Sequence, residues 1–94
     1  EYFQTIEKDT KFDLVIIDGN HRGDATLKYF DLIVQHIHNG SVVILDDIRW
    51  SESMYKAWCA ITRSSDATVT LDLYKLGIVF FNKNLSKENF KIRF

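Results

Sequence analysis

Two short apolar segments, each ending in acidic residues, constrain the fold of this chain more than any other feature. Residues 12–18 read FDLVIID and residues 41–48 read SVVILDDI, each with an unbroken apolar run at its centre. Between them, apolar residues recur at spacings of three and four, which is typical of one helix face: Leu27, Phe30, Ile33, Val34 and Ile37. A strand, a helix and a second strand predict a parallel α/β unit whose strands are buried on both faces.

The rest of the chain predicts a second helix and a closing hairpin. Ser51 is placed to cap a helix whose apolar face holds Met54, Ala57, Trp58 and Ile61. Residues 68–73 alternate apolar and polar side chains, as in a half-exposed strand near a sheet edge. Residues 78–82 follow too closely for a crossover helix, so we expect them to return antiparallel.

Turns and chain ends complete the predicted elements. We expect Asn39-Gly40 to end the first helix and residues 74–77 to form the hairpin turn. Residues 1–9 fit a short helical segment, and residues 90–94 fit a last edge strand or a docked tail. The chain begins with Glu1 rather than Met, so we expect residues 1–94 to be a single partial domain of a longer protein.

Composition and charge exclude several classes of function. The 12 Lys and Arg against 13 Asp and Glu give a net charge of -1, so no large basic field is present to bind nucleic acid or anionic lipid. The apolar runs are far shorter than the roughly 20 residues of a membrane span. The single cysteine, Cys59, cannot form an internal disulfide, which favours a reducing, cytoplasmic location.

Acidic residues end both predicted parallel strands. Asp18 closes the first strand, and Asp46 and Asp47 close the second. Because the carboxyl ends of parallel strands meet at one edge of a sheet, neighbouring strands would bring these carboxylates together. Such an oxygen set suits Mg²⁺, Mn²⁺ or Ca²⁺ better than zinc. The same residues are also suited to shaping the Gly19 turn and capping a helix, although Ser51 is the better cap.

Two further side chains lie close to these acids in the sequence. His21 follows Asp18 by three residues, and its imidazole is suited to proton transfer near neutral pH. Trp50 follows the acidic pair, where it either walls a pocket for a flat substrate or covers the end of the sheet. We expect Trp58 and Cys59 to be core residues of the second helix.

Residues 12–21, FDLVIIDGNH, followed by residues 39–50, NGSVVILDDIRW, resemble the second half of class I S-adenosylmethionine-dependent methyltransferases. The chain is most similar to a bacterial group with an acidic-Gly-x-His turn after strand four, related to metal-dependent catechol and caffeoyl-CoA O-methyltransferases. The resemblance covers nearly the whole chain. It implies a partial Rossmann-like sheet of strands four to seven with flanking helices, in the order four, five, seven, six, the last strand being antiparallel.

The resemblance also implies a site. In those relatives an Asp after strand four and an Asp-Asn pair after strand five bind Mg²⁺, so Asp18, Asp46 and Asp47 are implied as ligands of Mg²⁺ or Mn²⁺ that would orient and acidify a substrate hydroxyl. Asp18 is also implied at the S-adenosylmethionine cofactor. His21 stands where the relatives carry a lysine base, and Asp47 replaces their Asn, which makes the site more negative.

The family's cofactor loop has no counterpart in this sequence. The four glycines, Gly19, Gly23, Gly40 and Gly77, form no G-x-G loop, so we expect the isolated chain to be inactive. The resemblance implies that the strand at residues 12–18 would pair with strand one of the family, a strand that we expect this chain to lack. We therefore expect an apolar edge there through which two copies self-associate.

Three functions follow from these patterns. The leading one is metal-assisted O-methyl transfer to a small molecule as part of a longer protein, with nitrogen and carbon acceptors left open. The second is a non-catalytic, dimerising α/β module whose acids are only caps and turns. The third is a phosphate-receiver-like domain. It fits poorly because a receiver carries its acidic pair after the first strand, whereas here the pair follows the second strand.

Overall fold

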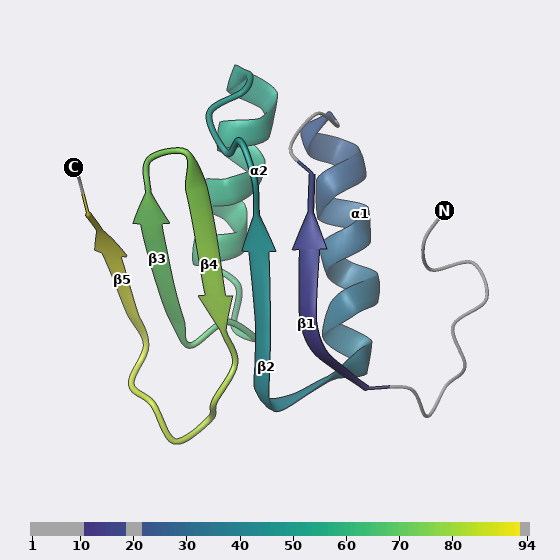
Figure 1. Ribbon diagram of the computed structural model, residues 1–94, viewed down its shortest axis with the longest axis vertical. Helices are drawn as coiled ribbons and strands as arrows, with labels where there is room; N and C mark the ends of the chain where they lie inside the picture. Colours follow the sequence, from purple (N-terminus) through teal and green to yellow (C-terminus); the bar gives the residue numbers. More distant parts are fainter. Residues whose placement is uncertain (1–10, 19–21, 93–94) are drawn as a thin grey trace.

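A mixed sheet is the centre of the fold. The computed structural model describes residues 11–18 and 22–92, and these form a five-stranded sheet in the order β1-β2-β4-β3-β5 (Figure 1). The strands β1 and β2 are parallel, as are β3 and β5, whereas β4 is antiparallel to both of its neighbours. The strand bounds are Phe12–Ile17 for β1, Ile37–Leu45 for β2, Val69–Leu73 for β3, Leu76–Phe80 for β4 and Glu88–Lys91 for β5.

Two helices cover the same face of this sheet (Figure 1). The first, α1, spans Gly23–Ile33 and continues into a 3-10 turn, η1, at Val34–His36; the second, α2, spans Glu52–Thr62. The hydroxyl of Ser51 accepts a hydrogen bond from the Met54 N–H at 3.1 Å, which confirms the predicted cap. The buried face of α2 is the predicted one: Met54, Ala57, Trp58 and Ile61.

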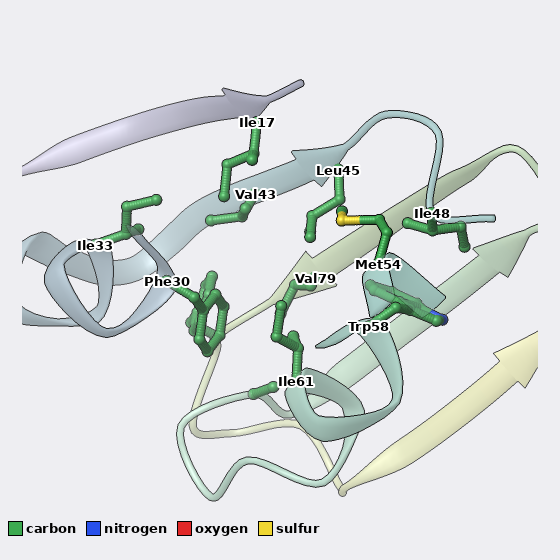
Figure 2. Packing of buried hydrophobic residues seen from close by; sticks show 12 residues of the cluster. Ile17, Phe30, Ile33, Val43, Leu45, Ile48, Met54, Trp58, Ile61 and Val79 are labelled. Carbon is green, nitrogen blue, oxygen red and sulfur yellow. The ribbon is translucent and has the colours of Figure 1, made fainter. Parts of the chain in front are cut away.

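The core lies between the helices and the covered face of the sheet. Figure 2 shows Ile17, Val43, Leu45 and Val79 of the strands directed toward side chains of α1 and α2. The helix residues in this cluster are Phe30, Ile33, Met54, Trp58 and Ile61. All of these side chains are buried, so the apolar face predicted for each helix is the one that packs on the sheet.

The start of β2 differs from the prediction. Ile37 lies in the strand and not on the helix face, and Asn39-Gly40 lies within β2 rather than ending α1. The register moves from Phe12 opposite Ile37 to Leu14 opposite Val42, so residues 38–41 form an extra bulged segment. Its polar groups are paired locally: the His38 N–H donates to the Ser41 hydroxyl, and that hydroxyl donates to the Phe12 carbonyl.

The closing hairpin begins earlier than predicted. The return strand β4 starts at Leu76, two residues before the expected Ile78, so Gly77 belongs to the strand and not to the turn. The predicted antiparallel return is confirmed, and so is a last edge strand, which starts at Glu88 and pairs with β3. The expected helical segment at residues 1–9 and residues 93–94 of the tail lie outside the described residues.

One face of the sheet carries apolar side chains under no described helix. Leu14 and Ile16 of β1 are 56% and 66% exposed, so the prediction that this strand is buried on both faces is wrong. In β3 it is the polar Thr70 and Asp72 that are buried, and Leu71 is only half-buried. Alternation along each strand explains this, because α1 and α2 cover a single face. The arrangement is consistent with the predicted Rossmann-like α/β sheet. Neither described helix is long and apolar enough to cross a membrane.

Candidate functional site

The ends of β1 and β2 bring three carboxylates together. Ile17 pairs with Leu45 at the last position of the parallel ladder, and the Asp46 N–H donates to the Ile17 carbonyl at 2.9 Å. The predicted side-by-side, same-direction arrangement of these strands is thereby confirmed. As a result, Asp18, Asp46 and Asp47 each offer a carboxylate oxygen within 4.8 Å of the others.

The loop after β2 is anchored on both sides of the acidic pair. Asp47 has a φ of 57°, in the left-handed region that non-glycine residues rarely adopt. Ile48 is fully buried, and the Trp50 N–H donates to the Asp47 carbonyl at 2.9 Å. The sharp turn at Asp47 keeps its carboxylate at the end of the sheet while the next residue enters the core.

Lys75 is the first site residue that sequence reasoning missed. Its ammonium nitrogen lies 3.1 Å from Asp46 Oδ1 and 3.3 Å from Asp47 Oδ1, and these contacts raise the pKa of Lys75. The Lys75 carbonyl accepts a hydrogen bond from the Ile48 N–H at 3.0 Å. The available signal was the hairpin itself, because a strand that returns antiparallel beside β2 places its turn next to the carboxyl end of β2.

Arg49 is the second missed residue. Its guanidinium donates two hydrogen bonds to the Asp72 carboxylate, at 2.8 and 2.9 Å, and a third to the Tyr74 carbonyl at 2.6 Å. It also lies 4.7 Å from the ring centre of Tyr55 and 4.5 Å from that of Tyr74. Arg49 therefore joins the loop after β2 to β3, to α2 and to the hairpin turn.

The pKa values of Arg49 and Asp72 are both shifted in the direction that keeps the two groups charged. Burial acts to raise the pKa of Asp72, but hydrogen bonds from Arg49 and the Tyr74 N–H, with the charge of Arg49, hold that pKa below its usual value. The Asp72 hydrogen bond raises the pKa of Arg49 against the opposing effect of burial. Both groups are charged at neutral pH, and each satisfies the other.

The hairpin turn is a tight one centred on Tyr74. The Lys75 N–H donates to the Leu73 carbonyl at 2.9 Å across a Tyr74 φ of 71°, which defines a γ-turn of the rarer, strained kind. The Tyr74 N–H donates to Asp72 Oδ1 at 2.9 Å. Arg49 and Asp72 thus hold a backbone conformation that Tyr74 would not adopt by itself.

An open hollow of about 380 Å³ lies beside the acids, lined by Asp47, Arg49, Trp50, Tyr74 and Lys75. Trp50 is 64% exposed and Tyr74 is 54% exposed, so both rings are accessible to a ligand. Among the described residues, the non-glycine positions with a positive φ are Asp47 and Tyr74, and both line this hollow. Strained backbone that gathers at one place is characteristic of functional sites.

The predicted site residues have different outcomes. Asp18, Asp46 and Asp47 are brought together, and Trp50 is among the residues that line the neighbouring hollow. His21 lies outside the described residues. The roles assigned to all of these residues stay predictions.

The chemistry of the acidic set fits a hard divalent cation. Its donors are carboxylate oxygens, the ligands that Mg²⁺, Mn²⁺ and Ca²⁺ prefer, and the set contains neither thiolate nor described imidazole. The side chains of Asp46 and Asp47 are 36% and 26% exposed, so an ion from solution can reach them.

Comparison with known proteins identifies one family. A family model described as a methyltransferase domain matches residues 1–48, which includes β1, α1, β2 and all three acids. Searches of curated proteins and of solved structures give no match to the chain.

Proposed function

The chain belongs to the methyltransferase domain family, and from that premise we propose that it forms the C-terminal half of a class I S-adenosylmethionine-dependent enzyme that methylates an oxygen atom of a small molecule. The observation that carries this proposal is the convergence of three carboxylates at the carboxyl ends of two parallel strands, where α/β folds place their active sites. The resemblance to metal-dependent O-methyltransferases supports the same assignment.

The proposed cation ligands are Asp18, Asp46 and Asp47, with Asp18 also facing the cofactor. When bound, the cation, Mg²⁺ or Mn²⁺, supplies Lewis acidity to an acceptor hydroxyl, and S-adenosylmethionine supplies the methyl group. His21, three residues after Asp18 in the sequence, is the proposed base that takes the hydroxyl proton.

The hollow next to the acids is the proposed acceptor site. Trp50 and Tyr74 present exposed aromatic surface to it, which suits a flat molecule, and Arg49 fixes the Tyr74 side of the wall. The sequence contains no G-x-G loop, so the main cofactor contacts would come from other parts of a longer protein, and the isolated chain would be inactive. The single cysteine supports a cytoplasmic location for this activity.

Calorimetric titration of the chain with Mn²⁺ and Mg²⁺ tests the cation site. We expect one saturable site, and we expect Asp46→Asn to weaken it by about tenfold or more because it removes one of three charged ligands. Asp31→Asn is the matched control: it removes the same charge from the exposed surface of α1 and should leave the affinity unchanged. Absence of saturable binding, or equal loss in both variants, contradicts the metal assignment and favours the non-catalytic module.

A further inference from the structure

The Asp46–Asp47 pair already has a cation in contact with it. The Lys75 ammonium lies 3.1 Å from one oxygen of Asp46 and 3.3 Å from one oxygen of Asp47. These two acids form the carboxylate cluster together with Asp18. A positive group that bridges two acids compensates the repulsion between them, which is also what a metal ion does in such a cluster.

The position of Lys75 is set by the main chain. The γ-turn at Tyr74 directs Lys75 toward β2, and the hydrogen bond from the Ile48 N–H to the Lys75 carbonyl ties this turn to the loop that carries the acids. The Arg49 contacts with Asp72 and the Tyr74 carbonyl hold the turn from its other side. The main chain of Lys75 is therefore held close to the acids, whatever rotamer its side chain adopts.

The Lys75 side chain itself is free to leave. It is 68% exposed, and its flexible stem lets the ammonium move into solvent without any change in the anchored backbone. An exposed lysine–carboxylate contact is weak, so a divalent ion at the same oxygens can replace it. The Lys75 ammonium and a divalent ion cannot both contact these oxygens, because the two positive charges would repel each other.

We propose that Lys75 is a built-in competitor of the divalent cation: its ammonium occupies the Asp46–Asp47 pair in the metal-free chain and is displaced when the metal binds. This inference rests on the cation site of the proposed function and adds the residue that sets the affinity of that site. The displaced ammonium would then lie in the acceptor hollow, which Lys75 lines together with Trp50 and Tyr74.

The test is calorimetric titration of Lys75→Gln with Mn²⁺, compared with the unchanged chain. Removal of the competing charge should tighten binding roughly threefold to tenfold, as the loss of two exposed ion-pair contacts suggests. Lys75→Arg keeps the charge and should not tighten binding. Lys83→Gln removes the same charge at the opposite end of the sheet, where the Lys83 N–H lies near Asn39, and should also have little effect.

Circular dichroism of each variant verifies that the fold is retained. Equal Mn²⁺ affinity in Lys75→Gln and the unchanged chain overturns the competition while leaving the cation site standing. Equal tightening in Lys75→Gln and Lys83→Gln also overturns it, because the effect would then be one of net charge. If neither the unchanged chain nor Lys75→Gln binds Mn²⁺, the cation site and the competition are both rejected.

Discussion

Arg49 connects several separate parts of the candidate site. It bridges Asp72 on β3, the Tyr74 carbonyl in the turn and the rings of Tyr55 and Tyr74. The Asp72 side chain is only 5% exposed, so its charge depends on this partner. Loss of one member of a largely buried pair leaves the other without compensation, which costs more than the pair contributes as a whole.

We therefore expect Asp72→Asn to lower the free energy of unfolding by about 2 kcal/mol, the range for hydrogen bonds to charged groups. Urea denaturation near neutral pH measures this difference. Asp24→Asn, which breaks an exposed pair with Arg22, is the control and should cost less than about 1 kcal/mol. An effect of equal size in the two variants would contradict the role given to the Arg49–Asp72 pair.

The same pair predicts a pH dependence of stability. The pKa of Asp72 is lower in the folded chain than its usual value, so the stabilisation is complete above the unfolded pKa of about 3.9 and is lost as the pH falls through the folded pKa. The stability difference between the unchanged chain and Asp72→Asn should shrink below about pH 4. Denaturation curves across this range check the sign, and a difference that grows toward acid would refute it.

At the scale of the elements, Gly77 decides how closely α2 packs on the sheet. Gly77 lies in β4, and a Cβ atom at this position would lie 2.5 Å from Trp58 Cζ3, inside contact distance. Trp58 is buried on α2, and its ring fills the space above the strand. The helix and the strand therefore approach as closely as they do because residue 77 has no side chain.

Gly77→Ala should lower the free energy of unfolding by about 1–3 kcal/mol, because the buried indole has to move. Gly40→Ala is the matched control: its added Cβ would lie 3.1 Å from the exposed His38 ring, which can shift, and the change should stay within about 0.5 kcal/mol. Urea denaturation of both variants makes the comparison. Equal stability of the two would show that β4 and α2 are not in tight contact.

The whole molecule has one covered and one open sheet face. Both helices lie on the same side in Figure 1, and the opposite face carries apolar side chains in register across neighbouring strands. One row runs through Leu14, Val42, Phe80 and Val69, and the next through Ile16, Ile44, Ile78 and Leu71. An apolar face of this extent, next to the edge strand β1, favours association.

We expect the isolated chain to self-associate through the edge at β1. Ile16→Lys places a charge among the exposed side chains of this strand and should shift the population toward monomer. Leu85→Lys, a change of the same kind at an exposed leucine far from β1 in the sequence, should not. Sedimentation velocity over a range of concentrations measures both, and a monomeric unchanged chain at every concentration would argue against the association.

The predictable part of the site was the part that depends on neighbouring strands. The acids at the ends of the segments now called β1 and β2 could be placed together because parallel strands joined by a helix lie side by side. Arg49, Asp72 and Lys75 were not predicted, because their contacts depend on where the β3–β4 hairpin lies against β2, although an antiparallel return beside β2 would have placed the turn with Lys75 near the acids. The alternation of residues 68–73 did not indicate that the polar Thr70 and Asp72, rather than the apolar residues, would be the buried members of the strand.

By itself the sequence determined the strand–helix–strand order, the Ser51 cap and the buried face of α2, because these depend on local periodicity or on capping chemistry. It also placed the acids at one end of the sheet, because parallel strands joined by a helix lie side by side. Only the tertiary structure decided which sheet face is covered, where β2 bulges and which cation meets the acids. Those features depend on how β1, the helices and the β3–β4 hairpin pack against β2, and long-range packing of this kind leaves no periodic trace along the chain.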